Sequence, residues 1–164
     1  MKIGIVYYSR SGNTKKVAEI LQERLKQQKA EAELIEIEHV KRPGFFSAGR
    51  AALADKELPI KNTDFDLKKY DTILVGSPTW GGRPSPFIKS FFNKAENYKG
   101  KKAGVFFTSG GATEKAHTGK NIKDYLGDKG LKLIENSLPV QMRKESILDG
   151  EQNIDNFVET VMKK

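Results

Sequence analysis

The stretch that decides the fold is KIGIVYYSRSGNT, residues 2–14. Its first part, residues 2–8, is a short run of apolar and β-branched residues, which is typical of a strand buried on both faces. Residues 13–29 follow with apolar side chains on one helical face and charged side chains on the other. The apolar positions are Val17, Ile20, Leu21 and Leu25. A buried strand that turns directly into an amphipathic helix indicates the start of a parallel β-α-β unit.

The rest of the chain repeats this alternation of strands and helices. Further extended segments are predicted at 33–38, 72–76, 103–108 and 130–140. Helices are predicted in three places: after Pro84 and Pro86, after the glycines at 110–111, and from Asp149, where Gln152 would complete a capping box. A long connection, 39–69, contains Phe45 and Phe46 and is expected to hold one short helix. We therefore expect a single α/β domain over residues 1–164, with a doubly wound parallel sheet covered on both faces.

The composition excludes several classes of site. The 164 residues are 37% hydrophobic and 30% charged, as in a globular protein, and none is cysteine. Disulfides, thiolate metal sites and cysteine nucleophiles are therefore excluded, and two histidines, His39 and His117, argue against a multi-histidine metal site. No apolar run approaches the ~20 residues that a membrane helix needs. The apolar N-terminal stretch is too short for a signal peptide, so we expect a cytoplasmic protein.

The net charge of +8 has two interpretations, a nucleic-acid or membrane surface and an ordinary lysine-rich surface. Lysines are interspersed with Glu and Asp, no block of like charges occurs, and no RNP, zinc-finger or arginine-rich signature is present. We therefore expect no nucleic-acid role and no membrane span. Positive charge favours encounter with acidic small molecules and acidic protein partners.

In open parallel sheets, ligands bind at the carboxyl ends of the strands. The first loop at this edge consists of Ser9, Arg10, Ser11, Gly12, Asn13 and Thr14. Its hydroxyls, its amide side chain and the free N–H groups of a helix start suit a phosphate, although plain helix capping is the alternative. The loop is neither a Walker loop nor a G-x-G-x-x-G loop, and it contains no lysine. A phosphate that is bound and kept fits this loop better than one that is transferred.

Two more loops at this edge are unusual in composition. The second loop runs from Ser77 to Arg83 and includes Pro78, Thr79, Trp80, Gly81 and Gly82. Its tryptophan either stacks on a ligand or folds back onto the core. The third loop contains Ser109, Gly110 and Gly111, which indicate either close approach to a ligand or a flexible turn. A phosphate site beside an aromatic clamp predicts a ligand with a phosphate tail and a flat ring, and FMN is the natural candidate. No metal site is predicted.

With these loops, the sequence resembles the flavodoxin family. The first loop matches the family's phosphate motif [ST]-x-[ST]-G-N-T, residues 76–82 match its first flavin-ring loop, and 109–111 stand in place of its second. The resemblance implies a five-stranded parallel sheet of order 2-1-3-4-5 and noncovalent FMN with redox chemistry. It further implies that residues 9–14 hold the phosphate and that residues 78–82 line the ring, with Gly81 at a peptide that reorients on reduction.

The sequence differs from the family's electron carriers in two respects. It is basic where they are usually acidic, and its third loop lacks the Tyr or Trp often found there, which would leave one flavin face open. Arg83 and His117 are candidates for cations near the ring, where positive charge would favour the anionic reduced flavin. Our first hypothesis is an FMN-binding electron-transfer protein of flavodoxin type. The alternatives are an NAD(P)H- or quinone-dependent FMN reductase and a non-redox module that binds another phosphorylated ligand.

The expected partner is either an acidic redox protein or a small-molecule electron donor or acceptor. The expected oligomeric state is monomer or homodimer.

Overall fold

The computed structural model describes residues 1–42, 44, 47, 50–51, 53–54, 56–111 and 117–163. The strands are β1 (Lys2–Tyr7), β2 (Glu31–Glu36), β3 (Thr72–Trp80), β4 (Arg83–Pro84), β5 (Lys102–Ser109), β6 (Lys132–Leu133), β7 (Leu138–Arg143) and β8 (Ser146–Asp149). The helices are α1 (Asn13–Gln27), α3 (Pro86–Phe92), α4 (Thr118–Asp128) and α5 (Gln152–Met162). Phe45 and Phe46, where a short helix is predicted, lie outside the described residues.

The sheet has the predicted strand order, with one addition. Its strands run β2-β1-β3-β5-β7-β8, and the first five are parallel to one another. This confirms the 2-1-3-4-5 order of a doubly wound sheet. Strand β8, which was not predicted, pairs antiparallel with β7 and forms the edge of the sheet. The short β4 and β6 pair with β3 and β5.

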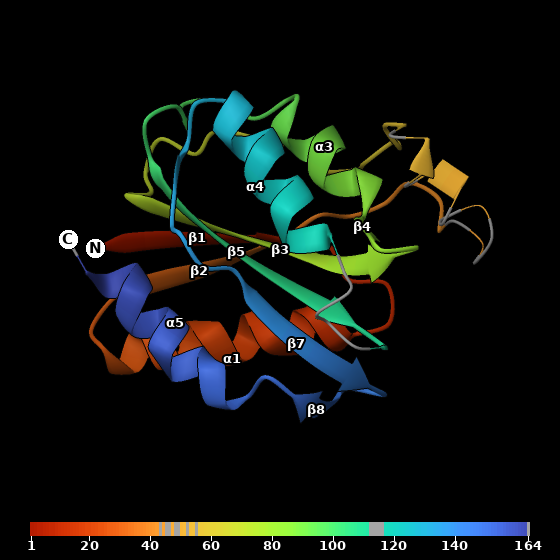
Figure 1. Ribbon diagram of the computed structural model, residues 1–164. Helices are drawn as coiled ribbons and strands as arrows, with labels where there is room; N and C mark the ends of the chain where they lie inside the picture. The colour runs from red at the N-terminus through yellow and green to blue at the C-terminus, as the bar shows by residue number, and fades with distance from the viewer. Residues whose placement is uncertain are drawn as a thin grey trace.

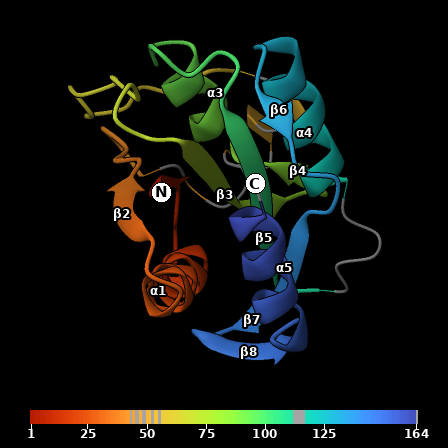
Figure 2. The same ribbon diagram turned by 90° about the vertical axis from the view of Figure 1, so that its left-hand side faces the viewer.

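Helices cover both faces of the sheet, as the buried strands require. Helices α1 and α5 lie on one face and α3 and α4 on the other (Figures 1 and 2). The central strand β1 shows why: Ile3 and Ile5 belong to the core beneath α1 and α5, whereas Val6 and the following Tyr8 belong to the core beneath α3 and α4. Successive side chains of a strand point to opposite faces, so one strand supplies both cores.

Two local predictions are wrong. Pro84 lies in β4, and only Pro86 stands in the first turn of a helix, where a missing N–H is tolerated. The capping box from Asp149 does not form, because Asp149 ends β8 and α5 has Glu151 at its N-cap. The Asp149 carboxylate instead accepts hydrogen bonds from the Gly150 amide at 2.8 Å and from Gln152 Nε2 at 3.3 Å. It therefore fixes the turn that leads into the helix.

The parallel strands bring their carboxyl ends to the same edge of the sheet, on the side away from both chain termini (Figure 1). The first loop follows β1 at this edge. The second predicted loop is partly strand, because β3 continues to Trp80 and only Gly81 and Gly82 form the turn to β4. The third loop begins at Ser109, the last residue of β5. Within the described part of the chain, no helix has both the length and the apolar character needed to cross a membrane.

Candidate functional site

The three loops meet around one cavity of about 340 Å³ at the carboxyl edge of the sheet. The residues that line it are Arg10, Ser11, Asn13, Thr14, Arg42, Pro78, Thr79, Trp80, Thr108, Ser109 and Gly110. The indole of Trp80 therefore lies in the same cavity as the hydroxyls of the first loop. The remaining predicted site residues belong to the same loops without lining the cavity. They are Ser9, Gly12, Gly81, Gly82 and Gly111.

Two polar side chains of the first loop are engaged in holding the site together. Thr14 Oγ1 lies 2.8 Å from Thr108 Oγ1 on β5, and both residues are buried. Asn13 Oδ1 accepts a hydrogen bond of 2.8 Å from the Glu145 amide in the turn between β7 and β8. These contacts join the first loop to two other strands, so Thr14 and Asn13 position the loop.

Plain capping does not account for the remaining donors of the first loop. The N-cap position of α1 is Gly12, which has a φ of 87° and no side chain, and the helix has no side-chain cap. Its dipole and first amides thus face the loop without a side-chain acceptor. Ser9 Oγ is inaccessible to solvent and has no hydrogen-bond partner within the described part of the chain. A buried hydroxyl without a partner is costly, and a ligand oxygen would satisfy it.

Arginine supplies the positive charge at this end of the cavity. Arg10 comes from the first loop, and Arg42 comes from the connection that follows β2. Arg42 donates a hydrogen bond of 3.1 Å from Nη2 to the Arg10 carbonyl, which brings the two residues together. Guanidinium groups, hydroxyls and helix amides form a donor set that suits a phosphate monoester. The phosphate of FMN therefore fits the residues present.

The ring end of the cavity is formed by Trp80, which both lines the cavity and contacts the core. The indole is half-buried, and its ring meets the ring of Tyr8 edge-on at a centroid distance of 5.6 Å and that of Phe87 at 6.3 Å. Thr79 Oγ1 lies 2.9 Å from Thr118 Oγ1 at the start of α4. The core therefore fixes the indole at the cavity wall, where one side can meet a flat ligand.

Tyr8 is a supporting residue that sequence reasoning did not single out. Its side chain is fully buried, and its hydroxyl has no hydrogen-bond partner among the described residues. Burial raises the pKa of Tyr8, while the positive charges of Arg10 and Arg42 act in the opposite direction. Its ring supports Trp80 from below, so Tyr8 helps to orient the wall of the cavity.

The glycines of the third loop have no close neighbours among the described residues. Gly110 and Gly111 are exposed, and a Cβ added to either would meet nothing within 4 Å among the described residues. The Gly111 amide donates to Ser109 Oγ at 3.2 Å, which forms a small turn. From residue 109 to residue 117 the sequence contains no aromatic side chain except that of His117.

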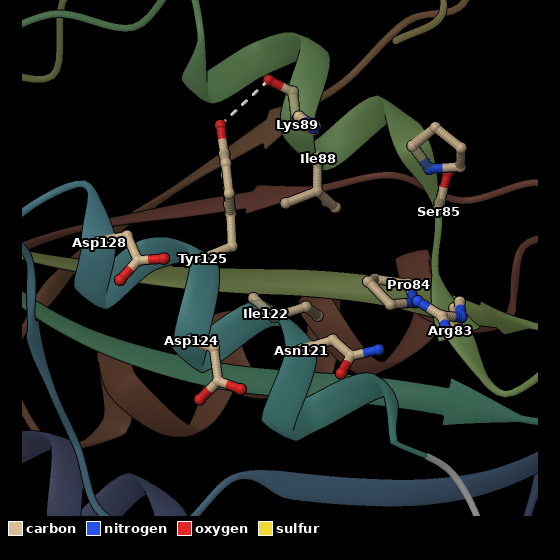
Figure 3. Close-up of a pocket in the computed structure, with 11 residues that line it drawn as sticks. Arg83, Pro84, Ser85, Ile88, Lys89, Asn121, Ile122, Asp124, Tyr125 and Asp128 are labelled. Carbon is tan, nitrogen blue, oxygen red and sulfur yellow. Dashed lines mark hydrogen bonds between the residues drawn. The ribbon is translucent and has the colours of Figure 1, made fainter. Parts of the chain in front are cut away.

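The two predicted cations of the ring site lie outside the residues that line this cavity. His117 is exposed at the N-cap of α4. Arg83 lines a second cavity of about 280 Å³ between α3 and α4. Figure 3 shows this groove, with Arg83 at one end, Asp124 and Asp128 toward the other, and Tyr125 bridging from α4 to the Lys89 carbonyl at 3.4 Å. The expectation that Arg83 and His117 tune a flavin stays a prediction.

Arg42 and Thr118 also act at the site without having been predicted, and Thr108, at the start of the predicted third loop, was not assigned a role there. Thr108 lies one residue before the end of β5, and Thr118 starts α4, so each is an ordinary residue at its place in the sequence. Arg42 lies in a long connection with no periodic pattern. No signal in a single sequence could have placed these residues against the first and second loops.

Comparisons with known proteins agree with this geometry. The family described as NADPH-dependent FMN reductase matches residues 1–132. Minor allergen Alt a 7 of Alternaria alternata is 31% identical over 116 residues, and an NAD(P)H dehydrogenase (quinone) of Gluconacetobacter diazotrophicus is 33% identical over 118 residues. Each match covers 66% of this chain and 56% of the relative, so the chain spans little more than half the length of these relatives.

Solved structures share the fold over nearly the whole chain. A flavoprotein from Lactobacillus acidophilus in complex with FMN is 28% identical, has a TM-score of 0.67 and is matched over 95% of this chain and 97% of its own. Flavodoxin 2 from Bacillus cereus is 24% identical with a TM-score of 0.66, over 98% and 97% of the two chains. The predicted cofactor, FMN, is confirmed at the level of the family. The comparisons favour the reductase alternative over the electron carrier, and the chain belongs to the NADPH-dependent FMN reductase family, with the flavodoxin-like fold.

Proposed function

We propose that this protein is an FMN-dependent reductase that oxidises a reduced nicotinamide nucleotide and passes the electrons to a quinone or a similar acceptor. The family match and the relative named NAD(P)H dehydrogenase (quinone) support this proposal. The observation that carries it is the uneven lining of the cavity, to which the second loop contributes the indole of Trp80 and the third loop contributes the exposed Gly110. An open face gives a second flat substrate access to the ring.

In this proposal, the first loop anchors the cofactor. Ser9, Ser11 and the first amides of α1 donate hydrogen bonds to the phosphate, and Arg10 and Arg42 balance its charge. Thr14 and Asn13 hold the loop in place through Thr108 and Glu145. Because these donors are fixed before the ligand arrives, little ordering is needed on binding.

The second and third loops form the ring site. Trp80 and Pro78 contact the flat ring, and the turn at Gly81 and Gly82 lies beside it. Bound FMN supplies the capacity to accept and to donate a hydride or single electrons. Among the described residues, no carboxylate or imidazole lines the cavity, so none of these residues acts as a general acid or base there. Protons reach the acceptor from water through the open side at Gly110 and Gly111.

Two other functions make different predictions. A flavodoxin-type electron carrier would bind FMN but would not oxidise NADH or NADPH at a useful rate. A non-redox module would bind neither FMN nor a nicotinamide nucleotide. The distinguishing experiment is to titrate the purified protein with FMN and then to measure anaerobic oxidation of NADH and NADPH, with and without a benzoquinone.

A pair of variants at one position makes this test sharper. Gly110→Tyr places an aromatic ring on the open side and is expected to lower the rate of NAD(P)H oxidation at least tenfold while FMN still binds. Gly110→Ala adds only a methyl group in open space and should leave the rate within about twofold of the parent. The reductase proposal is wrong if the FMN-loaded parent oxidises neither nucleotide.

A further inference from the structure

Arginine and lysine are distributed differently over this molecule. The chain has 29 lysines and arginines together, and the lysines are spread along all of it. Only six residues are arginine, and four of these lie at the carboxyl edge of the sheet. We call these four the arginine rim: Arg10, Arg42, Arg83 and Arg143.

Two residues of the rim line the cavity, and the other two lie on neighbouring elements at the same edge of the sheet. Arg10 and Arg42 line the cavity itself. Arg83 is the last residue of the second loop, begins β4 and is the register partner of Trp80. Arg143 ends β7, next to the turn that is bonded to Asn13 of the first loop.

The ion pairs distinguish Arg24, one of the two arginines outside the rim, from the residues of the rim. Arg24 on α1 pairs with Asp155 on α5, with 3.2 Å between Nε and Oδ1. Within the described part of the chain, Arg42, Arg83 and Arg143 have no carboxylate within 4.0 Å. Their guanidinium groups are therefore available to carboxylates or phosphates of another molecule, which arginine binds in a bidentate manner.

The opposite edge of the sheet has cations of another kind. There Lys69 and Lys2 lie 2.6 Å and 3.1 Å from the Glu33 carboxylate. Hydrogen bonds from Lys69, Tyr70 and Lys2, given in order of decreasing effect, lower the pKa of Glu33 to about 2. The charges at that edge balance one another inside the chain, whereas Arg42, Arg83 and Arg143 have no carboxylate partner among the described residues.

The rim is wider than the cavity. Neither Arg83 nor Arg143 lines it, and β5 separates β3 from β7 in the sheet. A ligand inside the cavity therefore has Arg10 and Arg42 to bind, whereas Arg83, which lines the groove between α3 and α4, and Arg143 lie outside the cavity. Large apolar side chains accompany them: Val40 is 55% exposed in the connection that carries Arg42, and Leu148 is 56% exposed on β8. Arginine and exposed apolar residues around a pocket are typical of a protein interface.

We propose that the arginine rim docks an acidic redox protein over the open side of the cavity. This inference rests on the proposed FMN site and adds a macromolecular acceptor to it. Docking over the third loop would bring a partner's redox centre next to the exposed flavin face. Two molecules of an acceptor with ferric iron would each take one electron, and the two-electron-reduced FMN would return to its oxidised form with release of its protons to water.

The test compares two redox proteins of opposite charge, an acidic rubredoxin and a basic cytochrome c. The FMN-loaded protein is reduced photochemically, and the rate constant of its oxidation by each acceptor is measured by stopped flow at several ionic strengths. We expect faster oxidation by the rubredoxin at low salt, and a fall of roughly tenfold as salt screens the rim. In the variant R83E/R143E, oxidation by the rubredoxin at low salt should be about tenfold slower than in the parent.

A matched control separates the rim from net charge. K99E/K132E makes the same change in charge at exposed lysines of the opposite edge. This control should keep the rubredoxin rate within about threefold, and both variants should keep the parent's NAD(P)H oxidation with a benzoquinone. The docking proposal is overturned if the rim and control variants slow equally, or if R83E/R143E affects only NAD(P)H oxidation. Because photoreduction needs no nucleotide, failure of NAD(P)H oxidation in the parent would refute the reductase proposal separately.

Discussion

The first loop and the third loop lie at the same cavity but differ in how firmly they are held. At the first loop, a Cβ added to Gly12 would lie 2.5 Å from Glu145 Oε1, and Thr14 and Asn13 are each bonded to another strand. At the third loop, a Cβ added to Gly110 would meet nothing within 4 Å. The difference indicates that one end fixes a ligand in place, while the other is left open for an exchange of substrates.

The largest expected effect comes from removing the donors of the first loop. Ser9→Ala with Ser11→Ala should weaken FMN binding by about 3 kcal/mol, because each hydrogen bond to a charged phosphate contributes about 1.5–3 kcal/mol. This corresponds to roughly a hundredfold increase in Kd. Fluorescence titration measures the Kd of the variant and of the parent for FMN and for riboflavin. Riboflavin has no phosphate, so an equal loss for riboflavin would contradict the assignment.

The choice of Ser9 and Ser11 illustrates what the sequence could and could not predict. The pattern of the first loop predicted its place and its donors, because a hydroxyl-rich turn between a buried strand and a helix is a local feature. It could not show which hydroxyls are free. Thr14 resembles the serines in sequence, but its hydroxyl is bonded to Thr108, which is 94 residues away.

The hairpin that holds the first loop was missed for another reason. Lys144 and Glu145 have φ values of 49° and 63° at its turn, conformations for which Gly or Asn is the usual signal. Lys and Glu at these positions do not indicate a turn. Long strands and amphipathic helices were predictable, since burial repeats along them, but tertiary contacts such as those of Glu145 and Arg42 have no periodic pattern.

A smaller effect is expected at the ring end of the cavity. Trp80→Ala removes one wall and should weaken binding by about 1–3 kcal/mol, as expected for the loss of one partly buried aromatic side chain. In contrast to the serine variants, FMN and riboflavin should be affected to the same extent, because they share the ring. If FMN affinity fell and riboflavin affinity did not, Trp80 would act on the phosphate, and the two ends of the cavity would not be separate.

Replacing Gly12 and Gly110 by alanine makes the same chemical change in the first loop and in the third loop, so the two variants compare these loops directly. Gly12→Ala should cost about 1–2 kcal/mol of unfolding free energy, because a φ of 87° is unfavourable for any residue with a Cβ. The Glu145 carboxylate can move aside, so backbone strain is the main cost. Gly110→Ala has no such strain, because Gly110 is not among the glycines with positive φ, and its stability should change by less than about 0.5 kcal/mol. Denaturant unfolding of both variants without ligand measures the difference, and equal losses would contradict it.

The smallest expected effect, about 1 kcal/mol, is the coupling between Thr14 and Thr108. Thr14→Val keeps the shape of the side chain but leaves the buried Thr108 hydroxyl without its partner, and Thr108→Val does the converse, so each change should lower the free energy of unfolding by about 1–2 kcal/mol. The double variant replaces both hydroxyls and should cost less than the sum, since no buried hydroxyl is left unpaired. A double-mutant cycle from urea unfolding measures this coupling. Additive losses would mean that the hydrogen bond contributes nothing to the rigidity of the first loop, and the comparison with the open third loop would then depend on Asn13 and Glu145 alone.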